Sequence, residues 1–231
     1  MDPKRLVAML DLTSLTGEES DDDIAALCAK AQTPLGPVAA VCVYGQYVQR
    51  ARSELEGLPI LVAAVANFPE GDLDAERARR EAGAAVEAGA SEVDVVLPWR
   101  AWLDGDRDGA LEVVAAARAE TPGALKVIIE SGSLGDRVRE AADDALGGGA
   151  DFVKTSTGKH GQGATPEAAR AMLEAVRAHG SGGFKASGGV RTREDAETYL
   201  DLADELLGPI GVSPQTFRIG ASTLLDELLA G

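Results

Sequence analysis

Two lysines lie inside short apolar runs, where lysine is seldom found. Lys154 follows Phe152 and Val153, and the turn after it ends in Lys159; Lys185 repeats this pattern in the run GGFKASGGVR. Loss of hydration lowers the pKa of such an amine toward the range in which its neutral form attacks a carbonyl carbon. A buried ion pair, or a side chain that reaches out to solvent, would explain one such lysine. Two of them, each followed by a Gly/Ser-rich turn, favour an active site that uses an amine.

Further ionisable side chains lie on neighbouring strand-like runs. Side chains alternate along a strand, so Asp94 shares a face with Val96, and Lys126 shares one with Ile128 and Glu130. If these faces point into one barrel, they form a compact cluster of mixed charge. The expected cluster consists of Asp94, Lys126, Glu130, Lys154 and Lys185, with Asp11 and Cys42 as further candidates. A purely structural ion network would have the same composition, so these residues alone leave the chemistry open.

Glycine-rich turns follow three of the strand-like runs and predict a phosphate site. Glycine lets backbone N–H groups approach an anion closely, and barrels often bind phosphate with their last two loops. A lysine in the turn after the sixth run adds a positive charge. The candidate phosphate-binding residues are Thr157, Gly158, Lys159, Gly188, Gly189, Gly220, Ser222 and Thr223. Tight turns alone are the alternative explanation for the glycines.

Strand-like and helical runs alternate along the whole chain. The strand-like runs are Leu10–Ser14, Val38–Val43, Ile60–Asn67, Glu92–Leu97, Leu125–Glu130, Asp151–Thr155, Gly183–Ser187 and Phe217–Gly220. The helical runs are Ser20–Gln32, Gln46–Glu56, Asp74–Ala88, Arg107–Glu120, Leu134–Gly147, Thr165–His179, Thr192–Leu207 and Ser222–Leu229, and Ser20, Thr165 and Thr192 are expected N-caps. Eight such units without a linker predict an α/β fold, a single (β/α)8 TIM barrel over residues 1–231. An open doubly wound sheet is the alternative, but the first strand-like run has no glycine-rich loop after it.

Composition narrows the function further. The net charge of −16, from 38 acidic and 22 basic residues, argues against binding to nucleic acid or an anionic membrane. No run reaches the roughly 18 apolar residues that a membrane span needs. Cys28 and Cys42 form no metal-binding pattern, which argues against a zinc site or a disulfide framework and favours a reducing cytosol and hence a cytoplasmic protein. The acidic excess fits either adaptation to high salt, as in a halophile, or the bias of an Arg/Ala-rich proteome.

The motifs that carry these residues closely resemble the deoxyribose-phosphate aldolases, a family of class I aldolases. They are EVDVVLPWRA, KVIIESG, DFVKTSTGK, FKASGGVRT and FRIGAS, and the likeness also includes LDLTSLT, VAAVCVY and NFPEG. The resemblance implies a (β/α)8 barrel and a lyase that reversibly cleaves 2-deoxy-D-ribose 5-phosphate into D-glyceraldehyde 3-phosphate and acetaldehyde, a step of deoxyribonucleotide catabolism. It implies a small phosphosugar substrate, no cofactor, and a homo-oligomer, dimeric or larger.

By this resemblance, Lys154 forms the Schiff base, Lys185 perturbs its pKa, and Asp94 is the acid/base partner in proton transfer. The substrate lacks a 2-hydroxyl group, so we expect an apolar wall near that carbon, formed by Val41, Val96 or Ile128.

The sequence departs from the family at two places. Gly45-Gln46 stands where relatives commonly carry a proline, which is expected to alter only a loop near the acceptor end of the pocket. The sequence ends in Leu229-Ala230-Gly231, without the tail tyrosine that assists proton transfer in some members. Tyr44 or Tyr47 would have to supply that assistance.

Two other functions remain compatible with the residues. One is a phosphosugar isomerase or epimerase that abstracts a proton with Asp94 and Glu130. The other is a catalytically silent phosphate-binding barrel, which the presence of Asp94 and both strand lysines disfavours.

Overall fold

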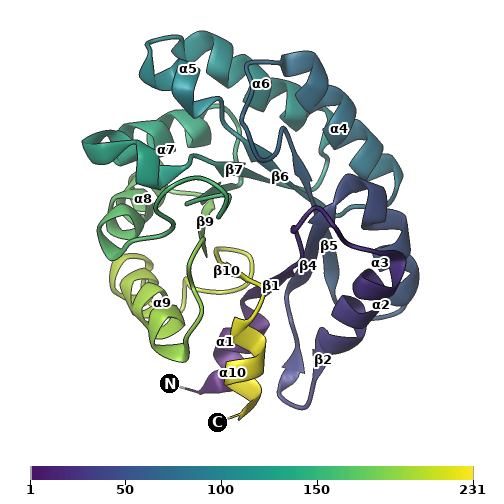
Figure 1. Ribbon diagram of the computed structural model, residues 1–231. Coiled ribbons are helices and arrows are strands. Elements are labelled where there is room, and N and C mark those ends of the chain that lie inside the picture. Colours follow the sequence, from purple (N-terminus) through teal and green to yellow (C-terminus); the bar gives the residue numbers. More distant parts are fainter. Residues whose placement is uncertain (1, 231) are drawn as a thin grey trace.

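The computed structural model describes residues 2–230 and has a closed barrel of eight parallel strands inside a ring of helices (Figure 1). The barrel strands are β1 (Leu10–Thr13), β4 (Ala40–Tyr44), β5 (Leu61–Ala66), β6 (Glu92–Val96), β7 (Ala124–Ile128), β8 (Phe152–Lys154), β9 (Gly183–Ser187) and β10 (Phe217–Ala221). Each strand pairs with its neighbours in chain order, and β10 closes the barrel onto β1. The predicted (β/α)8 barrel is confirmed.

Helices alternate with the strands and cover the outside of the barrel, and one further helix, α1, precedes β1 (Figure 1). They are α1 (Pro3–Ala8), α2 (Asp21–Lys30), α3 (Val48–Glu54), α4 (Ala75–Glu87), α5 (Trp99–Leu103), α6 (Arg107–Glu120), α7 (Val138–Gly147), α8 (Pro166–His179), α9 (Arg193–Leu207) and α10 (Leu224–Ala230). The expected N-caps are confirmed: the side chains of Ser20, Thr165 and Thr192 each accept a hydrogen bond from the backbone N–H three residues on.

Short elements account for most differences from the sequence-based expectation. The helices α1 and α5 and a small hairpin of β2 (Gln32–Thr33) with β3 (Gly36–Pro37) were not predicted, because so few residues carry no clear periodicity. The 3₁₀ turns η1 (Gly45–Tyr47) and η3 (Gly135–Arg137) replace the first residues of two expected helices, so α3 and α7 begin later than their sequence runs. A third 3₁₀ turn, η2 (Ser131–Ser133), lies in the connection between two expected elements.

The strands separate two layers of side chains. Outward-facing valines such as Val93 and Val95 pack against small residues of the helices, among them Ala78 and Ala82 of α4, and all four are fully buried. The small alanines let the helices lie close to the sheet. The inward face carries a charged cluster and, beside it, a smaller apolar group at the mouth of the barrel.

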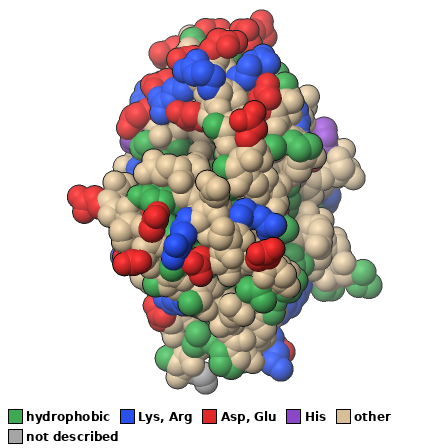
Figure 2. Space-filling model, turned by 90° about the vertical axis from the view of Figure 1, so that its right-hand side faces the viewer, with side chains coloured by type: hydrophobic (Ala, Val, Ile, Leu, Met, Phe, Trp, Pro, Cys, Tyr) green, Lys and Arg blue, Asp and Glu red, His purple; other side chains and the backbone are tan. Residues whose placement is uncertain are grey.

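The molecular surface carries most of the acidic excess. Figure 2 shows acidic and basic side chains interspersed over one face, with acidic groups gathered most densely at its top. Many of these residues form ion pairs, for example Arg107 with Glu140 and Asp144.

Candidate active site

Lys154, Lys185 and Asp94 meet inside the barrel. Strand register puts Lys154, the last residue of β8, directly beside Lys185 on β9. Oδ2 of Asp94 accepts a hydrogen bond from Nζ of Lys154 at 2.8 Å and from Nζ of Lys185 at 2.7 Å. Oδ1 of the same carboxylate accepts one from Lys126 at 2.9 Å. All four side chains are buried, so Asp94 is the common partner of three ammonium groups.

Asp11, Glu92 and Arg218 complete this cluster. Asp11 pairs with Lys185 and lies 2.6 Å from the Arg218 guanidinium, and Glu92 pairs with both Lys126 and Arg218. Asp11 and Lys126, both predicted, therefore belong to the network. Glu92 and Arg218 were missed, although the alternation rule would have found them two residues before Asp94 and Gly220, respectively.

The balance of charge singles out Lys154. Four cationic side chains in the cluster face three carboxylates, and Lys154 pairs with one carboxylate while every other cation contacts at least two. Burial lowers the pKa of Lys154, Asp94 raises it and Lys185 lowers it, and the net result is below the ordinary value for lysine. Loss of the Lys154 proton leaves the cluster neutral.

The neighbouring groups keep their charges. Burial acts to lower the pKa of Lys185, but Asp11 and Asp94 raise it above its usual range. Burial acts to raise the pKa of Asp94, but the ammonium groups of Lys126, Lys154 and Lys185 hold it well below that of an ordinary carboxyl. In the free protein the site therefore combines an amine that is readily deprotonated with a charged ammonium group on Lys185 and a charged carboxylate on Asp94.

Cys42 and Glu130, the other two network candidates, have different surroundings. Cys42 Sγ lies 3.9 Å from Oδ2 of Asp94, and burial raises the pKa of its thiol. Glu130 does not join the lysines: its carboxylate accepts hydrogen bonds from Thr157. The expectation fails because β7 ends at Ile128 and Glu130 adopts a left-handed conformation with φ of 53°, so strand alternation no longer applies there.

A cavity of about 530 Å³ opens over Lys154 between the C-terminal ends of β1, β8, β9 and β10. Its lining includes every residue predicted to bind phosphate: Thr157, Gly158, Lys159, Gly188, Gly189, Gly220, Ser222 and Thr223. The structure thus brings the three predicted turns together at one mouth. The loop of residues 13–16, together with Ser156, Ser187 and Arg191, also lines this cavity and was not predicted.

Two of these positions leave little room for a side chain. Gly188 has φ of +88°, and a Cβ there would lie 3.0 Å from Cα of Gly163 in the loop that follows β8. A Cβ at Gly220 would lie 3.0 Å from Cε of Lys185, so glycine leaves room for that side chain to cross the barrel.

The opposite half of the mouth is apolar. Its residues are Leu15, Cys42, Ala63, Val65, Phe68, Val96 and Ile128, with Tyr44 and Trp99 packed against them. Val96 and Ile128 lie on the inward side of the strands, as an apolar wall beside the substrate would require. Val41 is a wrong expectation, because Cys42 points inward on β4 and Val41 therefore packs outward among the core residues beneath the helices.

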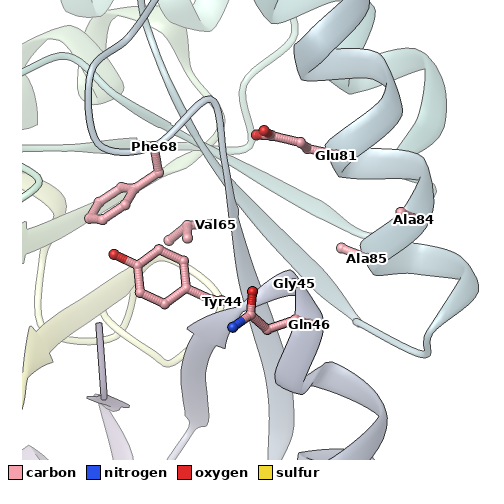
Figure 3. A pocket seen from close by; sticks show the side chains of 8 residues that line it. All are labelled: Tyr44, Gly45, Gln46, Val65, Phe68, Glu81, Ala84 and Ala85. Carbon is pink, nitrogen blue, oxygen red and sulfur yellow. The ribbon is translucent and has the colours of Figure 1, made fainter. Parts of the chain in front are cut away.

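A second cavity of about 270 Å³ lies beside this apolar half (Figure 3). The rings of Tyr44 and Phe68 lie on one side of it, 5.9 Å apart between centroids, and Glu81 reaches toward it from α4. Gly45 and Gln46 line this cavity rather than the one over Lys154. The hydroxyl of Tyr47 donates to the carbonyl of Glu19, so Tyr47 is engaged elsewhere.

Residues 2–230 offer no sign of two other kinds of site. No helix in that range is long and apolar enough to cross a membrane. No group of three or more His, Cys, Asp or Glu side chains in it could hold a metal ion, and the three carboxylates of the barrel cluster pair with lysine and arginine instead.

Residues 5–228 match the sequence profile of the DeoC/LacD family aldolases. The chain belongs to this family. A candidate deoxyribose-phosphate aldolase from Coccidioides immitis is 30% identical, with a TM-score of 0.85 over 97% of this chain and 85% of that one. The deoxyribose phosphate aldolase from Aeropyrum pernix, described as a tetramer, is 27% identical, with a TM-score of 0.80 over 99% of this chain and 91% of that one.

The structure is also similar to an epimerase, at much lower sequence identity. The N-acetylmannosamine-6-phosphate 2-epimerase from Clostridium perfringens is 15% identical, with a TM-score of 0.61 over 99% of this chain and 93% of that one. It shares the fold alone. The protein described here is an aldolase and hence a carbon–carbon lyase.

Proposed function

We propose that this aldolase reversibly cleaves 2-deoxy-D-ribose 5-phosphate into D-glyceraldehyde 3-phosphate and acetaldehyde through a Schiff base on Lys154. One observation carries the proposal: the buried lysine with a lowered pKa borders a cavity walled by three glycine-containing turns and Lys159. The amine supplies the electron sink for carbon–carbon cleavage, and the turns suit a phosphate at the far end of a short sugar.

The reaction begins when neutral Lys154 attacks the aldehyde carbon C1 and the carbinolamine loses water. The protonated imine then takes up the electron pair of the C2–C3 bond, while the C3 hydroxyl gives up its proton and becomes the aldehyde of glyceraldehyde 3-phosphate. The enamine left on Lys154 gains a proton at C2, and hydrolysis of the imine releases acetaldehyde. Each bond that breaks is matched by one that forms, without a redox step.

Asp94 and Lys185 have distinct parts in this scheme. Lys185 repels a proton on Lys154, since both ammonium groups contact the same oxygen of Asp94. As the protonated imine takes up the electron pair of the C2–C3 bond, the nitrogen of Lys154 becomes a neutral enamine nitrogen. Asp94 thereby loses one positive neighbour and can accept the C3 hydroxyl proton on Oδ2, directly or through water. The pKa of Asp94, which is low in the free protein, thereby rises during the reaction.

The two halves of the barrel mouth match the two ends of the substrate. The cavity over Lys154 takes the phosphate and the hydroxyl-bearing carbons. Val96 and Ile128 of the apolar half offer a surface without hydrogen-bonding groups to the deoxygenated C2. A 2-hydroxyl in that place would lose its bonds to water, which favours the deoxy sugar.

Borohydride trapping tests this function. With acetaldehyde and borohydride, the wild-type protein should gain one reduced adduct on Lys154, found by peptide mass mapping. Lys154→Ala should show neither adduct nor cleavage, whereas Lys159→Ala is the matched control that should still trap acetaldehyde, which has no phosphate. An adduct on Lys185 or Lys126 would overturn the assignment. Sugar isomerisation or epimerisation without an adduct would establish the carboxylate mechanism instead.

We also propose that the protein forms a homo-oligomer, as the Aeropyrum pernix aldolase does. Light scattering coupled to gel filtration tests this, and a monomeric mass across the micromolar range would contradict it.

A further inference from the structure

Glu130 is a buried carboxylate outside the lysine cluster. Its Oε2 accepts a hydrogen bond from the hydroxyl of Thr157 at 2.7 Å and a second from the Thr157 backbone N–H at 3.2 Å. The same threonine Oγ1 accepts a bond from the backbone N–H of Lys159 at 3.0 Å. A continuous chain of hydrogen bonds therefore runs from the end of β7 to the lysine at the cavity mouth.

The backbone of Glu130 indicates that this contact is strongly held. Its φ of 53° and ψ of 56° are left-handed, a conformation that a residue with a side chain adopts at an energetic cost. Glycine would relieve that cost but would remove the carboxylate. Within residues 2–230, its second oxygen Oε1 is buried without a hydrogen-bond partner, so the bonds to Thr157 are the ones that the side chain makes.

Close contacts fix the loops on both sides of the Thr157 turn. Ser131 N–H bonds to the carbonyl of Thr155 at 2.8 Å, which ties the ends of β7 and β8 together. Further along, Gly132 packs so closely on the Gln162 carbonyl that a Cβ would lie 2.0 Å from its oxygen. Between these two fixed points, the hydrogen bonds from Thr157 to Glu130 hold the start of the turn that carries Lys159. His160, directly after Lys159, lies 3.6 Å from the Glu70 carboxylate and beside the Trp99 ring.

We infer that Glu130 is a positioning residue that acts through Thr157 to hold the Lys159 turn in its anion-binding conformation. This inference deepens the proposed function and rests on it for the identity of the anion as the phosphate of the sugar. Glu130 lies outside the lysine cluster, so it sets affinity for the phosphate end and leaves imine formation on Lys154 unchanged.

Binding and kinetics with three variants test this role. Glu130→Ala should raise the Kd for inorganic phosphate, measured by calorimetry, by about tenfold, as expected for loss of a hydrogen bond to a charged group. It should raise KM for 2-deoxyribose 5-phosphate by a similar factor but leave KM for unphosphorylated 2-deoxyribose within about twofold. Glu130→Gln retains an acceptor oxygen and should restore most of both losses. Glu130→Gly removes the carboxylate without the backbone cost and should behave like Glu130→Ala.

A double-mutant cycle shows whether Glu130 acts through Thr157. Thr157→Val removes the hydroxyl that links Glu130 to Lys159, so it should cause a comparable loss, and adding Glu130→Ala to it should cost little more. Fully additive losses would overturn the inference, as would a phosphate Kd or a KM ratio unchanged in Glu130→Ala.

Failure of the proposed function would look different. Acetaldehyde trapping on Lys154 should be as efficient in Glu130→Ala and Glu130→Gln as in the wild type, which also shows that each variant is folded. If the wild type formed no adduct, the Schiff-base proposal would fall. The calorimetric comparison with inorganic phosphate would still decide the role of Glu130, because it requires no catalysis.

Discussion

Replacement of Lys185 by methionine isolates the effect of one buried charge on the nucleophile. Methionine keeps the length and packing of the side chain but removes the ammonium group. Asp11, the main partner of Lys185, retains Arg218 at 2.6 Å and so is not left as an unpaired buried charge. Asp94 retains both Lys126 and Lys154. The variant is therefore expected to fold.

The magnitude follows from the shared contact on Asp94. Two unit charges about 5 Å apart, at an effective dielectric constant of about 20, repel each other by roughly 3 kcal/mol. Each 1.4 kcal/mol or so changes a protonation ratio about tenfold. Without that repulsion the pKa of Lys154 rises, so the neutral fraction of the amine, and kcat/KM with it, should fall about 100-fold near neutral pH. Because the neutral amine is the reactive form, activity should recover as the pH is raised.

The assay is the pH dependence of kcat/KM for cleavage, together with the pH dependence of acetaldehyde trapping on Lys154. Lys126→Met is the matched control, since it also removes a buried lysine. Lys126 contacts the other oxygen of Asp94, and its neighbour in the strand register is Asp94 and not Lys154. In Lys126→Met, the rise of kcat/KM on the acidic side of the pH profile should shift less than it does in Lys185→Met. A profile unchanged in Lys185→Met, or equal shifts in the two variants, would refute this reasoning.

Three further predictions concern the phosphate turn, acid stability and salt. Gly189→Leu places a side chain at φ of +88° and should raise KM for the phosphorylated sugar far more than for 2-deoxyribose; equal changes would mean that the turn serves only the fold. Asp11 and Asp94 have lower pKa values in the folded protein than in the unfolded chain, where the pKa is near 4, so their charged forms stabilise the folded state at any pH above about 4. The urea midpoint of unfolding should therefore fall as the pH drops below about 4, and a midpoint that stays constant down to about pH 2 would contradict this. The net charge of −16 opposes compactness at low ionic strength, so the melting temperature should rise between about 0.1 and about 2 M KCl, and a constant value would leave the acidic composition as proteome bias.

The sequence determined the fold and identified the charged residues that meet inside the barrel. The strand-like runs all became barrel strands, because each alternates with a helical run and so makes a parallel pairing the simplest closure. Lys154, Lys185 and Asp94 could be found in advance because a charged residue within an apolar run is itself a signal. The alternation of side chains along a strand would also have identified Glu92 and Arg218.

Only the tertiary structure decided how these groups divide their charge and where the chain leaves the strand pattern. That Lys154 has one carboxylate partner, while Lys185 and Lys126 have two or more, depends on distances between different strands. Glu130 has the spacing of an inward-facing residue, yet a left-handed turn after Ile128 sends it to Thr157. Sequence periodicity describes a side chain's direction only while the strand continues; beyond its end, backbone conformation and the packing of distant loops fix which groups meet.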